Sequence, residues 1–366
     1  MTDSFEYVFP AIRGVQARHE FYVSMCPLRL IPKIFLFNEE ELVPELRAQR
    51  VLNKSRLPEM AQYILNNREN YTFSAITASV DADVRFEPIA TGSDAKRLGL
   101  LHIPMSAKFI INDGQHRRAA IEMALRENPD VADESIAVVF FLDIGLERCQ
   151  QMFADLNRYA IRPSKSLGVL YDHRDDVAQL AKLVVFKSPV FRDVVDMERS
   201  TLSLKSRKLF TLSAIYTATS ALLANLDKGT TKDRAEVAAA FWEEVAKQFP
   251  EWQAVRERRM PASDVRRDFI HSHGIALQAI GKVGNQLLQS GTGGWKRPLA
   301  KLKSLDWSRA NAKLWEGRAM IGGRVSKAGH NVTLTTSAIK RHLKLPLTPD
   351  EQRIEEAFLR GEHGRN

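Results

Sequence analysis

The spacing of apolar residues changes about halfway along the chain. In the first 170 residues, short stretches rich in β-branched, aromatic and other apolar residues alternate with polar turns that contain glycine or proline. Such stretches are typical of strands. They predict strands within 20–26, 33–37, 71–80, 83–90, 99–113 and 135–143.

Helical spacing interrupts this strand pattern and then replaces it. Leu57, Met60, Ala61, Ile64 and Leu65 stand at positions i, i+3, i+4, i+7 and i+8, so they share one face of a helix. Residues 117–128 and 146–160 predict two further helices. From residue 175 onward the pattern is almost wholly helical, as in 211–226 and 234–249, and the glycine-rich stretch 290–298 breaks it.

These patterns together predict an α+β protein. Its length of 366 residues favours two domains over a single core. We expect a mixed α/β domain over residues 1–175 and a mostly helical domain over 176–366.

The composition is that of an ordinary globular protein, with 44% hydrophobic and 27% charged residues. The N-terminus lacks the pattern of a signal peptide, and no apolar run has the length of a membrane span. We therefore expect a cytoplasmic protein with no membrane partner. Cys26 and Cys149 have no metal-ligand spacing, so we expect two ordinary buried thiols and no metal site.

The net charge of +9 is unevenly distributed. Residues 256–344 hold 18 Lys and Arg against 5 Asp and Glu, a balance of 18 − 5 = +13, which leaves 9 − 13 = −4 for the rest of the chain. A basic region beside a near-neutral one is expected where a protein meets a polyanion. Nucleic acid is the commonest such partner, and a solvated basic surface is the alternative.

The densest polar chemistry lies in the stretch FIINDGQHRRAA, residues 109–120. A predicted strand ends there in a turn at Gly114, and a helix is predicted to start near His116 to Arg118. Backbone N–H groups at a helix start can bind an anion, Arg117 and Arg118 can bind two phosphate oxygens, and Gln115 adds a neutral partner. Asp113 and His116 could move a proton or organise a metal, whereas the structural alternative is a capped helix whose arginines pair with acids.

DGQHR at 113–117 resembles the motif of the DGQHR-domain proteins, which is similar to the GxHR signature of the ParB and sulfiredoxin-like fold. The stretches 13–37, 48–65, 74–88, 101–125 and 153–176 further resemble the DndB family, and 269–281 and 334–349 match it more loosely. The resemblance implies a ParB/sulfiredoxin-like core in the N-terminal domain. It also implies a DNA-binding regulator that represses the operon of a DNA phosphorothioation system and limits modification.

The same resemblance leaves an enzymatic alternative, a ParB-like ATPase or DNA-nicking enzyme. Asp113, His116 and Glu59 would then be catalytic, with ATP and Mg²⁺ as the cofactors to test. In either case the resemblance implies a basic segment and an acid facing the turn, which makes Arg50, Arg56 and Glu59 candidates for the opposite wall of the site. The predicted phosphate- or nucleotide-binding residues are Asp113, Gly114, Gln115, His116, Arg117, Arg118 and Arg56. Double-stranded promoter DNA is the expected partner, with other proteins of the modification system and a homo-oligomer as further expectations.

Further polar stretches predict contacts with the DNA backbone. The loop 157–165 is poor in apolar residues, which favours phosphate contacts over packing. Basic residues interleave with Trp295, Trp307 and Trp315, and a short helix at 333–343 would suit DNA. The predicted DNA-binding residues are Asn157, Arg158, Arg162, Lys165, Lys296, Arg297, Lys301, Lys303, Lys340 and Arg341. In HSHG, residues 271–274, we expect one buried and one exposed histidine on an ordinary helix.

Overall fold

The computed structural model describes residues 5–35, 54–90, 92, 95–142, 148, 151–152, 154–156, 163–226, 229–291 and 294–361. The chain divides into two compact units, unit 1 over residues 1–161 and unit 2 over 162–366. Each unit has its own hydrophobic core, one around Phe9, Ile76 and Phe140 and the other around Trp242, Ile280 and Trp315. No helix among these residues is long and apolar enough to cross a membrane.

Unit 1 is built on a seven-stranded mixed sheet with the strand order β4-β5-β1-β2-β7-β3-β6. All neighbouring strands are antiparallel except β3 and β7. The strands are β1 (Glu6–Gln16), β2 (His19–Pro27), β3 (Ile76–Asp81), β4 (Arg85–Pro88), β5 (Leu98–Pro104), β6 (Lys108–Asp113) and β7 (Ser135–Phe141). The buried residues of β7 alternate with half-buried ones, so one face of this strand is fully covered.

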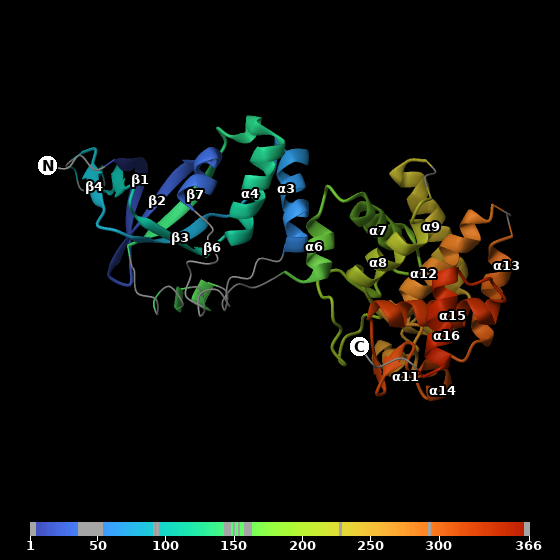
Figure 1. Ribbon diagram of the computed structural model, residues 1–366. Coiled ribbons are helices and arrows are strands. Elements are labelled where there is room, and N and C mark those ends of the chain that lie inside the picture. The colour runs from blue at the N-terminus through green and yellow to red at the C-terminus, as the bar shows by residue number, and fades with distance from the viewer. Residues whose placement is uncertain are drawn as a thin grey trace. The chain divides into compact units, whose positions relative to one another are not determined.

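Two helices of unit 1, α3 (Leu57–Asn66) and α4 (Gln115–Glu127), lie side by side in Figure 1. Ala61 and Ile64 of α3 are buried, which confirms the apolar stripe that the sequence predicts there. In α4, Ala120, Ile121 and Ala124 are buried. The remaining helical segments are α1 (Ile31–Ile34) and the 3-10 turns η1 (Leu28–Leu30), η2 (Lys54–Arg56), η3 (Ala95–Arg97) and η4 (Pro129–Val131).

The strand predicted at 33–37 is wrong where the structure describes it. Ile31 to Ile34 form the single helical turn α1, and Pro32 stands at its start. Proline is favoured in the first turn of a helix because its fixed φ suits that position and its missing N–H costs no hydrogen bond there. Residues 36 and 37 lie outside the described residues.

Unit 2 is mostly helical. Its helices are α6 (Lys165–Tyr171), α7 (Asp176–Lys187), α8 (Leu212–Leu223), α9 (Thr231–Ala246), α10 (Pro250–Arg256), α11 (Ala262–Asp268), α12 (Gly274–Gln289), α13 (Lys296–Leu299), α14 (Ala312–Trp315), α15 (Gly329–Leu343) and α16 (Pro349–Leu359), with the 3-10 turn η5 (Ala300–Ser304). The strands β8 (Val195–Asp196), β9 (Phe210–Thr211), β10 (Met320–Ile321) and β11 (Arg324–Val325) form two small ladders. The predicted α+β class is therefore confirmed, and the ParB-like assignment stays a prediction.

The helices α8 and α12 run parallel and pack closely. Gly274 lies opposite Ala214 at their start, and the Asn285 amide donates to the carbonyl oxygens of Leu222 and Ala224 at their end, at 2.9 and 2.7 Å. Between them, a Cβ on Gly281 would stand 2.4 Å from the Ala218 carbonyl oxygen. The close approach requires glycine here. Because the two helices run parallel, both of their N-termini lie at the same end of unit 2.

Candidate functional site

The DGQHR stretch forms the junction between β6 and α4. Asp113 ends the strand, Gly114 precedes the helix and α4 begins at Gln115. A bulge lies just before the junction, because Thr77 pairs with Asp113 while Ala78 pairs with Ile111. Bulges bend a strand and often redirect side chains next to functional sites.

Gly114 has a backbone conformation that other residues rarely adopt. Its φ is +109°, and a Cβ there would approach the Ile76 Cγ1 atom to 3.1 Å. Glycine therefore allows the chain to pass from strand to helix within one residue. It also leaves the start of α4 without a side-chain cap.

Two motif side chains hold the junction together. The buried Gln115 amide donates to the Ile111 carbonyl oxygen at 3.3 Å. The Arg118 guanidinium, also buried, donates to the Phe35 carbonyl oxygen at 2.9 Å and to a carboxylate oxygen of Glu122. In this structure Arg118 therefore positions the start of α4 against the α1 region.

Arg117 links the two sides of the turn. Its Nη2 donates to Asp113 Oδ2 at 2.7 Å and to the Ala75 carbonyl oxygen at 3.0 Å. The side chain is partly exposed, so the pair is not sealed from solvent. The structural alternative was a capped helix whose arginines pair with acids. Arg117 does pair with Asp113, but the Asp113 side chain does not cap the helix.

His116 lies in a positive environment. Burial lowers the pKa of His116, the nearby Arg56 and Arg117 lower it further, and Asp113 opposes them. The interaction with Arg56 places the η2 turn, which leads into α3, close to the start of α4. Sequence reasoning expected this proximity between Arg56 and the motif.

The start of α4 has the electrostatics of an anion site. Its first turn holds no acidic residue but contains His116, Arg117 and Arg118. Cations are unfavourable beside the positive end of a helix dipole, so a bound anion would relieve the repulsion. Among the described residues, the backbone N–H groups of Gln115 and Arg117 make no hydrogen bond.

The structure describes only some of the other residues predicted in the first 165 positions. Glu59 is exposed in the first turn of α3. Arg50, Cys149, Asn157, Arg158 and Arg162 lie outside the described residues. Lys165 is exposed at the start of α6.

Four predicted DNA-binding residues of unit 2 lie together in sequence and are exposed: Lys296, Arg297, Lys301 and Lys303, on α13 and η5. None of the four has an ion-pair partner in the part of the chain that the structure describes. His342 Nε2 lies 3.1 Å from the Lys301 carbonyl oxygen and 2.9 Å from Ser304 Oγ. These contacts bring the C-terminal end of α15 beside η5, although the two are 38 or more residues apart in sequence.

The structure does not support the predicted role of α15 and Lys340 as a DNA-contacting helix. The Lys340 side chain is buried, and its ammonium donates to both carboxylate oxygens of Glu351 at 2.7 Å. The predicted helix over 333–343 is part of α15, which is buried around most of its circumference because it packs against α12 and α16. Arg341 remains half-exposed, 3.5 Å from Glu355.

Several tryptophans and one histidine of unit 2 lie in or against its core. Trp307 and Trp315 are buried and stack on each other, while Trp295 is half-buried. His271 is buried and accepts a hydrogen bond from the Trp252 indole at 3.0 Å. His271 and His273 precede α12, not within a helix as expected. Within the described residues, no group of three His, Cys, Asp or Glu side chains could hold a metal ion.

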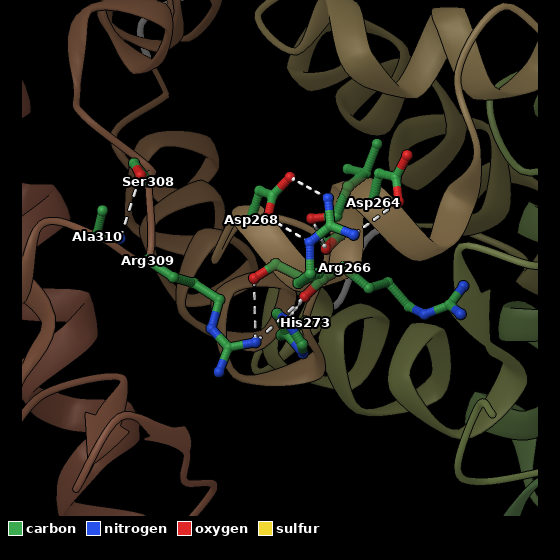
Figure 2. A network of polar contacts seen from close by, with 10 residues as sticks. Asp264, Arg266, Asp268, His273, Ser308, Arg309 and Ala310 are labelled. Atoms are coloured by element: carbon green, nitrogen blue, oxygen red, sulfur yellow. Dashed lines mark hydrogen bonds and ion pairs between the residues drawn. The ribbon is translucent and has the colours of Figure 1, made fainter. Parts of the chain in front are cut away.

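Sequence reasoning missed a basic cavity in unit 2. Arg266, His273, Arg309 and Lys327 line a space of about 420 Å³ at the N-terminal end of α12. Figure 2 shows Arg309 reaching from its loop toward the backbone beside His273. These residues come from three separate segments, so spacing could not reveal them. The available signal was the excess of basic over acidic residues in 256–344.

Comparison with known proteins gives one result for this chain. The family model for DndB, described as DNA-sulfur modification-associated, matches residues 9–346. The match includes the DGQHR junction, α13, η5 and all but the end of unit 2. No curated protein and no solved structure matches.

Proposed function

Because the chain belongs to the DndB family of DNA-sulfur modification-associated proteins, we propose that it is a regulator that binds double-stranded DNA. In this proposal it binds the promoter of the modification operon, represses the operon and so limits modification. The observation that carries DNA binding is the group of exposed cations on α13 and η5, Lys296, Arg297, Lys301 and Lys303. Without carboxylate partners among the described residues, these charges are available to phosphates.

The start of α4 supports a second contact with phosphate. Arg56, His116 and Arg117 surround an uncapped helix N-terminus that has no acid in its first turn. Such a site suits one phosphate group of the DNA backbone or of a nucleotide. Gln115 and Arg118 would act by fixing the junction, since both are buried and bonded within unit 1.

The DNA-binding proposal is tested by the salt dependence of binding to a promoter duplex. Each phosphate that a lysine neutralises releases counterions, so affinity should fall steeply with salt. Replacing Lys301 and Lys303 by alanine should weaken binding at every sequence and lower the slope of log affinity against log salt by about 2. The measurement is fluorescence anisotropy over a salt series.

A matched variant controls for the loss of two charges. Lys187 and Lys232 are lysines of α7 and α9, away in sequence from η5, and the double alanine variant changes the net charge equally. It should bind as the parent protein does. Equal weakening by both double variants would contradict a specific role of η5, and an affinity independent of salt would contradict DNA binding through phosphates.

The phosphate site on α4 is tested by the titration of His116. A bound anion should oppose the effect of Arg56 and Arg117 and raise the His116 pKa. NMR titration of the ring proton with and without duplex DNA measures this change, and the signal is assigned with His116→Gln. A pKa that stays the same at saturating DNA would contradict DNA phosphate binding at this site.

A further inference from the structure

The basic cavity of unit 2 is separate from the DGQHR junction and from the lysines of η5. It measures about 420 Å³, which lies within the range of small-molecule pockets, roughly 300–1,000 Å³. Its walls come from the loop 200–209, the starts of α8 and α12, and the side chains of Arg266, Arg309 and Lys327. The cavity lies entirely within unit 2.

Among the described residues, three cations of the cavity, Arg266, Arg309 and Lys327, have no ion pair with an acid, whereas a fourth, Arg267, has two. Asp264 and Asp268 both pair with Arg267, at 3.1 and 2.8 Å. Arg309 donates instead to carbonyl oxygens, to that of Arg267 at 3.2 Å and that of Gly323 at 2.9 Å. Figure 2 shows Arg309 directed at the backbone beside His273.

Lys327 is the cation best placed to contact a ligand. Its ammonium nitrogen would lie 3.4 Å from a Cβ on Gly274, the first residue of α12. In the part of the chain that the structure describes, Lys327 has no hydrogen bond or ion pair. Burial lowers its pKa and the nearby Lys165 lowers it further, so no carboxylate balances its charge.

The backbone at the start of α12 also supplies hydrogen-bond donors for an anion. No side chain caps α12, and the N–H groups of Gly274, Ile275 and Ala276 make no hydrogen bond among the described residues. A cation facing these donors is unfavourable unless an anion lies between them. The cavity therefore supplies the ammonium, the guanidinium charge and the amide donors that a phosphate group requires.

Part of the cavity wall is apolar. Leu202, Leu204 and Leu209 line it, and Leu204 is 81% exposed. Arg266 fixes this wall, because its guanidinium donates to the carbonyl oxygens of Ser203 at 2.8 Å and Ser206 at 3.2 Å. A ligand with an anionic end and a flat, less polar end would satisfy both parts of the wall.

We propose that this cavity binds a nucleoside phosphate, with the phosphates on Lys327, Arg309 and the start of α12 and the nucleoside against the leucines of 200–209. Arg266 is then a positioning residue. Duplex DNA is a poorer occupant because its backbone lies along an extended surface and the cavity has the size of a single small molecule.

Binding of ATP to the full chain, measured by isothermal titration calorimetry, tests the proposal. Lys327→Ala should weaken ATP binding by about tenfold or more, as expected for the loss of a hydrogen bond to a charged group. Lys282→Ala removes an exposed lysine of α12 that does not line the cavity, and it should bind ATP as the parent does. Leu204→Ser should weaken ATP but not inorganic pyrophosphate.

The proposal would be overturned by the absence of ATP binding at millimolar concentration, by equal weakening in Lys282→Ala and Lys327→Ala, or by displacement of ATP by adenosine as effectively as by pyrophosphate. His116→Gln separates this cavity from the site proposed on α4. ATP binding that depends on His116 and not on Lys327 would also overturn it. DNA binding through η5 can fail or succeed independently of each result.

Discussion

His273 stands at the start of α12 as a neutral histidine. Its Nε2 lies 2.8 Å from the Arg266 carbonyl oxygen, so this nitrogen carries the proton and donates it. Burial lowers the pKa of His273 to about 4, and Arg309 contributes in the same direction. Because the unfolded chain protonates near pH 6.5, it binds more protons than the folded chain between pH 6.5 and 4.

The consequence is a loss of stability on acidification. The contribution of His273 is fully present above pH 6.5 and falls as the pH drops toward 4, by about 2 kcal/mol at pH 5 and about 3 kcal/mol in total. His273→Gln removes the titration and keeps a donor. Urea unfolding at pH 7.5 and pH 5 should show the parent losing about 2 kcal/mol more than the variant over this interval. Parallel losses would show that His273 does not titrate as described.

The parallel pair of α8 and α12 depends on a glycine at their contact. A methyl group on Gly281 would stand 2.4 Å from the Ala218 carbonyl oxygen, so Gly281→Ala must push the helices apart. We expect a loss of about 2–3 kcal/mol in the free energy of unfolding, the usual cost of overpacking. Chemical denaturation followed by circular dichroism measures it.

A second glycine provides the control for this substitution. Gly168 lies inside α6, and a Cβ there would meet nothing within 4 Å. Gly168→Ala should be neutral or stabilise by about 0.5–1 kcal/mol, because alanine loses less backbone freedom on folding. A similar loss in both variants would point to helix propensity rather than to the close contact of α8 and α12.

Elements with a strong period were predictable from the sequence. The stripe of α3 and the apolar run of β7 match the structure because each pattern is the direct result of one buried face. The strand predicted at residues 33–34 was wrong because Pro32 starts a helical turn within an apolar stretch. The helix predicted over 333–343 is part of α15, but the exposed position expected for Lys340 was wrong. Buried threonines and Lys340 make hydrogen bonds inside unit 2, among them Thr336 to the Val332 carbonyl oxygen.

The candidate sites likewise include features that the sequence could predict and features that it could not. The DGQHR junction was predictable because its residues are consecutive, and Gly114 has the left-handed φ that a strand-to-helix turn needs. The contact of the buried Arg118 with the Phe35 carbonyl oxygen could not be predicted, because the two residues are 83 positions apart in sequence. The cavity around Lys327 was not predictable either, since tertiary packing brings together the loop 200–209, the starts of α8 and α12, and the side chains of Arg309 and Lys327.

At the scale of the whole molecule, the two cores share no residue. Each unit holds a core of its own, as independently folding domains do. We therefore expect the full chain to unfold in two transitions rather than one. Arg118→Met removes the buried guanidinium that donates to the Phe35 carbonyl oxygen and to Glu122, while Glu122 keeps Arg126 as a partner. The substitution should destabilise only the transition of unit 1, by about 1.5–3 kcal/mol.

Differential scanning calorimetry of three proteins distinguishes the transitions. Gly281→Ala should lower the melting temperature of one transition, and Arg118→Met that of the other. ATP binding in the cavity of unit 2 should raise the melting temperature of the transition that Gly281→Ala lowers, because a ligand stabilises the folded state that binds it. A single transition that both substitutions shift equally would mean that the two cores unfold as one cooperative body.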